Sequence, residues 1–140
     1  VRLQDFCVFI KEKYGGSLDK MFDQDTQLLR AELLSLKGIG KETADSILLY
    51  AGGKPTFVSD AYTRRFLDRY GLLDGNAGYD DIRDYFMARL PQDVYLYNEY
   101  HALIDHHSYC VCRANPDCGQ CRIKYINKHV YCRSQFKNSR

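Results

Sequence analysis

Apolar residues recur along the first fourteen positions with the spacing of an amphipathic helix. The apolar positions are Leu3, Phe6, Cys7, Ile10 and Tyr14, which follow i, i+3, i+4, i+7 and i+11. Residues with this spacing lie on one stripe of a helix, and the pair Gly15-Gly16 ends the pattern. We therefore expect a helix over residues 1–14 and, on its apolar face, a buried Cys7 thiol that packs in the core.

The same periodicity predicts further helices along the chain. Their expected ranges are about 25–36, 41–51, 61–70, 82–89 and 92–108. The stretches KPTFVSD and GLLDGNAGYD between them carry Pro, Gly and Asn and indicate connections. Strict alternation of apolar and polar residues is nowhere sustained, so no strand is predicted. The chain is expected to be all-α.

Two glycines separate the second and third predicted helices in the stretch Gly38-Ile39-Gly40. Glycine permits the backbone angles of a tight helical hairpin and leaves room for a ligand beside the backbone. The free amides at the start of the second helix favour an anion, and a nucleic-acid phosphate fits there without any base being read. Ile39 would pack inward and fix the hairpin. An ordinary helix connection with a glycine C-cap is the alternative.

Charge is distributed unevenly along the 140 residues. The net charge is +2, yet residues 113–140 contain seven Lys or Arg and a single acid, Asp117, which leaves −4 on residues 1–112. A basic tail favours a polyanionic partner. No run approaches the roughly 18 apolar residues of a membrane helix, so no membrane association is expected. The chain opens in helical rhythm without an initiator Met, and we expect it to be part of a longer protein.

Cysteines are concentrated near the C-terminal end. Five of the six lie between Cys110 and Cys132, and no secretory signal precedes them. This clustering favours metal or cluster ligation over a disulfide framework.

The longer string LLSLKGIGKETADSILLYA resembles the helix-hairpin-helix of the endonuclease III superfamily of DNA glycosylases, whose common form is L-P-G-[VI]-G-x-x-T-A. In that family a connection then leads to a catalytic aspartate, and here KPTFVSDAYTRR follows. The family also ends in a four-cysteine loop. The resemblance covers nearly the whole chain and implies the helix-hairpin-helix glycosylase fold without its N-terminal helices. Residues 1–60 would belong to the helical barrel domain with the hairpin at 33–51, and residues 61–140 to a second helical domain.

Asp60 matches the catalytic aspartate of the family. Without that resemblance it would be interpreted as an N-cap of the next helix, and both roles can coexist. A fixed carboxylate stabilises the positive sugar of a breaking N-glycosidic bond and orients water. Family members that also nick the strand carry a lysine nucleophile four positions after the first hairpin glycine, where this sequence has Glu42. Lys41 is rotated by about 100° on the helix. The resemblance therefore implies a glycosylase without lyase activity.

Further residues receive roles from the same resemblance. The DNA-contacting set would be Lys37, Gly38, Ile39, Gly40, Lys41 and Thr43, with Lys41 either on a phosphate or solvated. Glu42 and Tyr62 are pocket candidates, although Glu42 suits a first helical turn and Tyr62 equally suits the core. Arg64 and Arg65 could face phosphate, or one of them could form a structural ion pair. The branch that includes 3-methyladenine glycosylases is the most similar and suggests an alkylated, flipped-out base.

The cysteine loop resembles the family pattern C-x6-C-x2-C-x5-C around a [4Fe–4S] cluster. The sequence offers Cys112, Cys118, Cys121 and Cys132, with Cys110 as an alternative to Cys112. The spacings depart from the family, and four sulfurs could instead hold zinc. Such a loop, over residues 110–132, would fix basic residues against DNA. His106 and His107 are expected at the surface or as caps, not as ligands.

Two other functions remain open at this point. One is a non-catalytic DNA-binding module that uses only the hairpin and the basic loop; the other is a helical protein-interaction module with a zinc loop. The expected partner is double-stranded DNA with a damaged base, bound by a monomer. The expected location is the cytoplasm, associated with the nucleoid if the source is prokaryotic.

Overall fold

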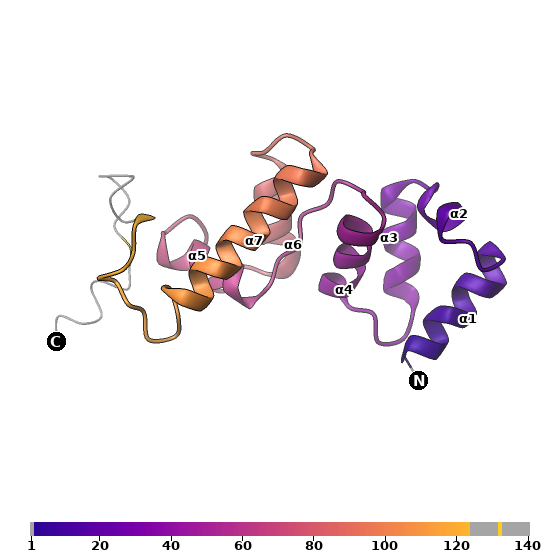
Figure 1. Ribbon diagram of the computed structural model, residues 1–140, viewed down its shortest axis with the longest axis horizontal. Coiled ribbons are helices and arrows are strands. Elements are labelled where there is room, and N and C mark those ends of the chain that lie inside the picture. The colour runs from indigo at the N-terminus through magenta and orange to yellow at the C-terminus, as the bar shows by residue number, and fades with distance from the viewer. Residues whose placement is uncertain (1, 124–131, 133–140) are drawn as a thin grey trace.

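Helices account for all the regular secondary structure in the computed structural model, which describes residues 2–123 and 132 (Figure 1). The α-helices are α1 (Arg2–Tyr14), α2 (Leu18–Phe22), α3 (Thr26–Ser35), α4 (Lys41–Ser46), α5 (Ala61–Arg69), α6 (Tyr79–Met87) and α7 (Val94–Cys110). A π-helical turn, η1 (Ile47–Ala51), continues α4 without a break. No strand occurs among these residues, so the all-α prediction is confirmed.

The predicted helices are present, with local corrections. The short helix α2 was not predicted because five residues are too few to show a periodicity; Ser17 caps it by accepting from the Lys20 amide at 3.3 Å. Helix α6 begins at Tyr79 instead of about 82, because Asp81 accepts from the Gly78 amide at 2.8 Å and closes the first turn. Helix α7 runs on to Cys110.

Two hydrophobic cores lie next to each other along the long axis of the molecule (Figure 1). The first is built by α1 to α4 and the start of η1, and it contains Met21, Leu29, Leu33, Ala44 and Leu48. The second lies among η1, α5, α6 and α7, where the Phe57 ring stacks on Phe86 at 3.9 Å and Tyr97 meets it edge-on. Consecutive residues of η1 serve both, since Leu48 belongs to the first core and Leu49 to the second. The division into domains at residue 60 stays a prediction.

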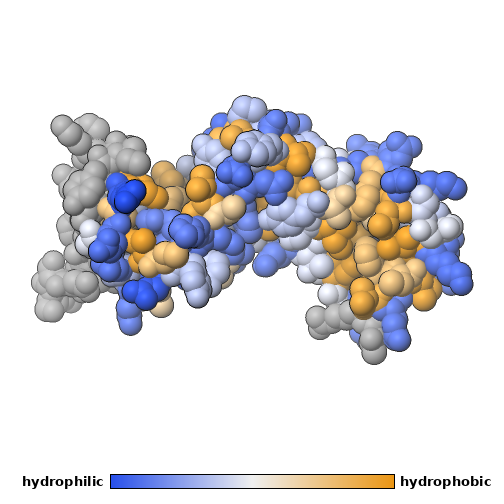
Figure 2. Space-filling view, in the orientation of Figure 1, coloured by the Kyte–Doolittle hydropathy of each residue, from blue (hydrophilic) through white to orange (hydrophobic). Residues whose placement is uncertain are grey.

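The apolar stripe of α1 is only partly covered. Tyr14 is buried, but Cys7 is exposed, and Leu3 keeps 74% of its surface accessible. The prediction that Cys7 is a core thiol is therefore wrong: periodicity identifies the apolar face but not how far it is covered, and α1 packs mainly on the short α2. Figure 2 shows apolar side chains gathered at the end of the molecule formed by α1 to α4.

A buried polar network connects the helices around the second half of the hairpin. Asp45 is fully buried and accepts two hydrogen bonds from the Arg30 guanidinium, at 2.8 and 3.0 Å. Thr56 donates to the same carboxylate at 3.1 Å, and Arg83 donates to Thr56 at 2.9 Å. A buried charge needs such partners. The network therefore fixes α3, α4, the connection 52–60 and α6 relative to one another.

Most of the basic tail, residues 124–131 and 133–140, lies outside the described residues, and with it five of its seven basic side chains. Within the described part of the chain, no helix combines the length and the apolar character that a membrane crossing requires.

Candidate functional site

The Gly38-Ile39-Gly40 turn has the geometry of a tight helical hairpin. Gly38 has φ +90°, a left-handed conformation that side chains with a Cβ rarely adopt. Gly40 is the N-cap of α4, and its carbonyl accepts from the Ala44 amide at 2.9 Å. A Cβ placed on Gly40 would meet no atom of the described residues within 4 Å. The backbone of Gly40 is thus open to an approaching ligand.

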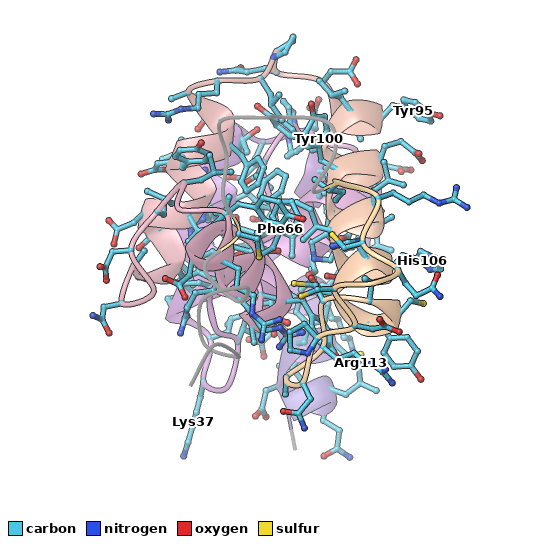
Figure 3. All side chains as sticks on the ribbon, turned by 90° about the vertical axis from the view of Figure 1, so that its left-hand side faces the viewer. Lys37, Phe66, Tyr95, Tyr100, His106 and Arg113 are labelled. Carbon is cyan, nitrogen blue, oxygen red and sulfur yellow. The ribbon has the colours of Figure 1, made fainter. Side chains whose placement is uncertain are left out.

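The side chains around this turn divide into an inner and an outer set. Ile39 packs against the first core, as predicted. Lys37 and Thr43 are exposed, and Lys37 extends away from the rest of the molecule (Figure 3). Lys41 forms an ion pair with Asp80 on α6, where the sequence suggested a phosphate contact or a solvated side chain. This pair also lowers the pKa of Asp80, with Arg30 contributing.

Asp60 is the N-cap of α5, and its carboxylate is fixed from one side by Thr63. Its Oδ1 accepts from the Thr63 amide at 2.7 Å and from the Thr63 hydroxyl at 2.8 Å. Thr63 itself is fully buried, while Asp60 is half-buried at the end of the connection 52–60. The capping interaction therefore holds the carboxylate in one orientation at an accessible position.

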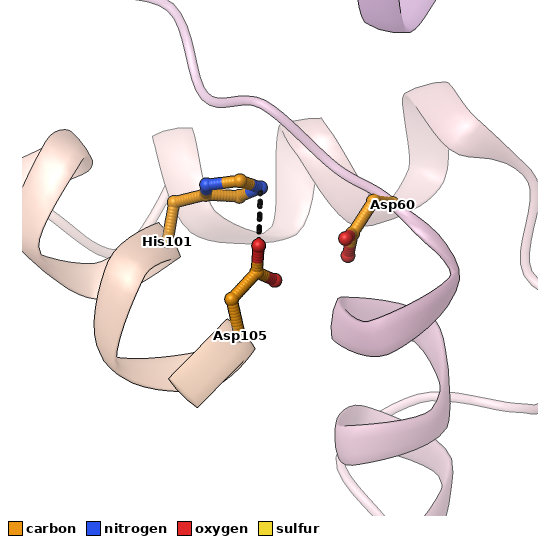
Figure 4. Close-up of side chains that lie close together, drawn as sticks. All are labelled: Asp60, His101 and Asp105. Atoms are coloured by element: carbon orange, nitrogen blue, oxygen red, sulfur yellow. Dashed lines mark ion pairs between the residues drawn. The ribbon is translucent and has the colours of Figure 1, made fainter. Parts of the chain in front are cut away.

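Helix α7 brings His101 and Asp105 to Asp60, although neither residue was singled out from the sequence. One ligand-type atom from each of the three side chains lies within 4.8 Å of the other two (Figure 4). The hydroxyl of Tyr50, on η1, lies 2.9 Å from His101 Nδ1, and His101 Nε2 lies 3.9 Å from Asp105 Oδ2. Helical spacing i, i+4 places His101 and Asp105 on one face of α7, but only the packing of α7 on α5 and η1 reveals which residues that face meets.

Negative charge accumulates at this cluster. Burial raises the pKa of Asp105, and the charge of Asp60, a hydrogen bond with Asp60 and the charge of Glu42 raise it further, whereas His101 lowers it. Burial also raises the pKa of Tyr50, together with the charges of Asp105, Asp60 and Glu42. Glu42 is therefore close enough for its charge to act on the groups around Asp60.

The pocket candidates Glu42 and Tyr62 are both exposed. The Arg65 guanidinium lies 4.9 Å above the Tyr62 ring and donates to the carbonyls of Cys112 and Ser108, at 3.0 and 3.2 Å. Arg65 thus has a structural role. One of the expectations was an ion pair, but the polar partners of Arg65 are backbone carbonyl groups. Arg64 is exposed.

Four cysteines converge beside the end of α7. Cys112, Cys118, Cys121 and Cys132 line one small cavity together with Tyr70, and Cys112, Cys121 and Cys132 are buried. Cys110, the alternative to Cys112, is exposed and does not line the cavity. The separation along the chain between Cys121 and Cys132 therefore does not prevent the four sulfurs from surrounding one space. Four thiols around a common centre fit the donor set of an iron–sulfur cluster.

Arg69, at the end of α5, organises the loop that carries Cys112. Its guanidinium donates to the carbonyls of Cys112, Arg113 and Ala114, at 2.8, 2.6 and 2.9 Å, and to Cys112 Sγ at 3.2 Å. The Tyr70 hydroxyl lies 3.3 Å from Cys121 Sγ. His107 is half-buried, with Nε2 4.0 Å from Cys121 Sγ, although it was expected at the surface or as a cap. Sequence reasoning missed Arg69 because a basic residue in a last helical turn has an ordinary explanation.

A separate apolar pocket of about 380 Å³ lies among α5, α6 and α7. Phe66 and Tyr100 line it, with Leu103 and Ile123 (Figure 3). Asp60, Glu42 and Tyr62 do not line this pocket. The role of Glu42 and Tyr62 as base-pocket residues therefore stays a prediction.

Comparison with known proteins gives a consistent result. The helix-hairpin-helix motif family matches residues 27–50. A Methanocaldococcus jannaschii protein with the provisional name of a DNA repair glycosylase is 49% identical over 124 residues, which are 88% of this chain and 56% of that protein. The endonuclease III of Sulfolobus acidocaldarius is 34% identical over 114 residues, which are 81% of this chain and 51% of that protein.

A solved structure of endonuclease III, trapped as a covalent intermediate with DNA, has a TM-score of 0.77 with 23% sequence identity. The superposition covers 99% of this chain and 59% of the other. The chain belongs to the endonuclease III-like superfamily of helix-hairpin-helix DNA glycosylases, and its fold is that of endonuclease III. It spans about half the length of the curated relatives it matches.

Proposed function

We propose that the full-length protein is a base-excision DNA glycosylase that hydrolyses the N-glycosidic bond of a damaged base with Asp60 and water. The observation that carries this proposal is the Asp60 carboxylate, which Thr63 holds in place at the start of α5 and which stands after a matching helix-hairpin-helix. The names of the relatives, a DNA repair glycosylase and endonucleases III, support the same class of reaction.

The hairpin would hold the DNA backbone. The open face of Gly40 and the first amides of α4 offer hydrogen-bond donors to a phosphate oxygen, and Lys37 and Thr43 are exposed beside them. Such a contact positions the duplex without reading its sequence. The flipped nucleotide would then be presented to the carboxylate at the start of α5.

The carboxylate would act when the bond between base and sugar breaks. Positive charge then develops on the sugar, and a fixed negative group nearby stabilises it. The same carboxylate can orient or deprotonate the attacking water. We propose an alkylated purine as the substrate by analogy with the branch that includes 3-methyladenine glycosylases. A cationic alkylated base leaves readily, so its removal needs little acid catalysis.

Strand cleavage by a lyase step is not part of the proposed reaction. A Schiff base requires an amine, and the position of the family's nucleophilic lysine is occupied by Glu42, which cannot form one. The neighbouring Lys41 is paired with Asp80 and points to a different side of α4.

A [4Fe–4S] cluster is proposed as the occupant of the cysteine cavity, held by Cys112, Cys118, Cys121 and Cys132. The convergence of these four residues and the hydrogen bonds from Arg69 to their loop support it. When bound, the cluster would cross-link the four cysteines that follow α7. That cross-link would keep Arg113 and Arg122 on a fixed surface near DNA.

The test is a screen of the full-length protein against duplexes that each contain one defined lesion. We expect release of a damaged base and strand breakage only after alkali treatment, with no adduct on borohydride reduction. Efficient borohydride trapping at the rate of base release would contradict the monofunctional mechanism. Failure to release any base, combined with tight and salt-sensitive DNA binding, would favour a non-catalytic DNA-binding module.

A further inference from the structure

Asp105 has a buried oxygen atom that lacks a conventional hydrogen-bond donor. Among the described residues, no N–H or O–H group donates to Asp105 Oδ1. The Asp60 carboxyl group, however, lies beside it, with one carboxylate oxygen of each residue within 4.8 Å of the other, and a hydrogen bond with Asp60 contributes to the raised pKa of Asp105. Two carboxylates can form a hydrogen bond only when one of them is protonated. One proton in the pair would therefore satisfy the buried oxygen.

Every charged or titratable neighbour identified around the pair bears on where that proton resides. Glu42, on α4, adds negative charge, and His101, one turn before Asp105 on α7, has its Nε2 3.9 Å from Asp105 Oδ2. The Tyr50 hydroxyl on η1 contacts His101 Nδ1; when it donates there, Nε2 carries the hydrogen and faces Asp105. Asp60 Oδ1 already accepts two hydrogen bonds from Thr63. Asp105 has no such donors on its Oδ1 and is the better site for the proton.

We propose that Asp105, in its protonated form, is a positioning residue for Asp60 that donates a hydrogen bond to the catalytic carboxylate and limits the pair to one negative charge. Thr63 would hold the carboxylate from α5, and Asp105 would hold it from α7. One fixed negative charge matches the single positive charge that develops on the sugar. The inference rests on the proposed function, because Asp60 must act in base excision for its orientation to affect turnover.

DNA binding would reinforce this arrangement. A duplex that covers the cluster removes water and brings phosphate charges, and both effects favour the protonated form of a carboxyl group. In the free protein the pKa of Asp105 is already raised, which also favours the protonated form.

The test compares three forms of the full-length protein by single-turnover excision over a range of pH. Asp105→Asn keeps a hydrogen-bond donor beside Asp60 at every pH, whereas Asp105→Ala removes it. We expect the rate to fall about tenfold to a hundredfold in Asp105→Ala, the range that corresponds to one hydrogen bond to a charged group, and by less in Asp105→Asn. The wild-type rate should also fall as pH rises through the pKa of Asp105, and this limb should be missing from Asp105→Asn.

Glu99→Gln is the matched control, because Glu99 is an exposed carboxylate of the same helix, two residues from His101 and on another face. It should reproduce the wild-type pH profile. Identical pH profiles for the wild type and Asp105→Asn would overturn the inference while the excision activity itself still stands. Excision that requires an added divalent cation would also overturn it, because Asp60, His101 and Asp105 would then be metal ligands.

A second readout does not depend on activity. In an NMR titration of side-chain carboxyl carbons, Asp105 should titrate above the usual range of an aspartate and move toward that range in Asp60→Asn. An ordinary titration of Asp105 in the wild type would refute the shared proton, whatever the excision rate. A protein that shows the shifted titration but releases no base would instead contradict the proposed function, and with it any positioning role of Asp105 in excision.

Discussion

Asp60 combines two residue-scale roles that sequence reasoning usually treats as alternatives. Its hydrogen bonds with Thr63 cap α5, and the same bonds fix the carboxylate that is proposed to act on the sugar. The capping role was predictable from Asp before a helix. Its partners His101 and Asp105 were not predictable, because they lie more than forty residues away and only the packing of α7 on α5 brings them near.

The stability of the protein should depend on pH through Asp105. Its pKa in the folded state is raised above the unfolded value, so folding takes up a proton between the two pKa values. This contribution is fully present below the unfolded pKa and is lost as pH rises through the folded pKa. Urea unfolding at a series of pH values should show this loss in the wild type and not in Asp105→Asn. Parallel curves for both proteins would contradict it.

At the scale of elements, the hairpin separates the demands of folding from those of binding. Position 38 favours glycine because its backbone is left-handed, whereas Gly40 has an extended backbone and open space around it. The motif L-x-G-x-G predicted both glycines as one unit. In the structure, glycine is needed at position 38 for the backbone conformation and at position 40 for the open space that a ligand would occupy.

Alanine substitutions should separate these two reasons. Gly38→Ala should lower the free energy of unfolding by about 1–2 kcal/mol, the cost of a left-handed conformation with a Cβ. Gly40→Ala should leave stability nearly unchanged and weaken binding to a duplex, because the new methyl group stands where a phosphate would approach. Urea unfolding and fluorescence anisotropy measure the two effects. Unchanged DNA affinity in Gly40→Ala would argue against a phosphate at the hairpin.

The buried network of Asp45 is the second feature of this scale, and sequence reasoning missed it. Asp45 follows the hairpin motif on α4 and its partners come from α3, the connection 52–60 and α6. An aspartate within an amphipathic helix has no pattern that predicts burial. Only the arrangement of the helices reveals that it lies inside.

Removal of this carboxylate should be costly. Asp45→Ala leaves the largely buried guanidinium groups of Arg30 and Arg83 without the carboxylate that pairs with them. The free energy of unfolding should therefore fall by about 3–5 kcal/mol. The matched control is Asp84→Ala, since Asp84 pairs with the same Arg83 but is exposed, and its loss should cost about 1 kcal/mol or less. Both are measured by urea unfolding. Equal effects of the two substitutions would contradict a structural role for the buried network.

At the scale of the whole molecule, the sequence predicted the all-α class and the order of the long helices, because periodicity and glycine signals are local. It did not predict how completely each face is covered. Cys7 was expected inside and is exposed, and the choice between Cys110 and Cys112 could not be made from spacing. Coverage depends on which elements meet, and that information is distributed over the entire chain.

The cysteine cavity predicts which thiols bind iron. The full-length protein should be yellow-brown with visible absorbance, and Cys112→Ser should lose most of the iron because Cys112 lines the cavity. Cys110→Ser is the control and should keep both the colour and the iron, since Cys110 is exposed outside the cavity. Iron and sulfide analysis tests the pair. A colourless protein that contains zinc would contradict the iron–sulfur assignment.

The central claim is that Asp60 carries out base excision, and one comparison of variants tests it most directly. Base release from a lesion duplex is measured for the full-length wild type, Asp60→Asn and Asp93→Asn. Asparagine remains a good N-cap, and Asp93 caps α7 as Asp60 caps α5, so the last variant controls for the change of cap. The account predicts that Asp60→Asn alone loses base release and still binds the duplex like the wild type. Base release by Asp60→Asn at the wild-type rate would contradict it.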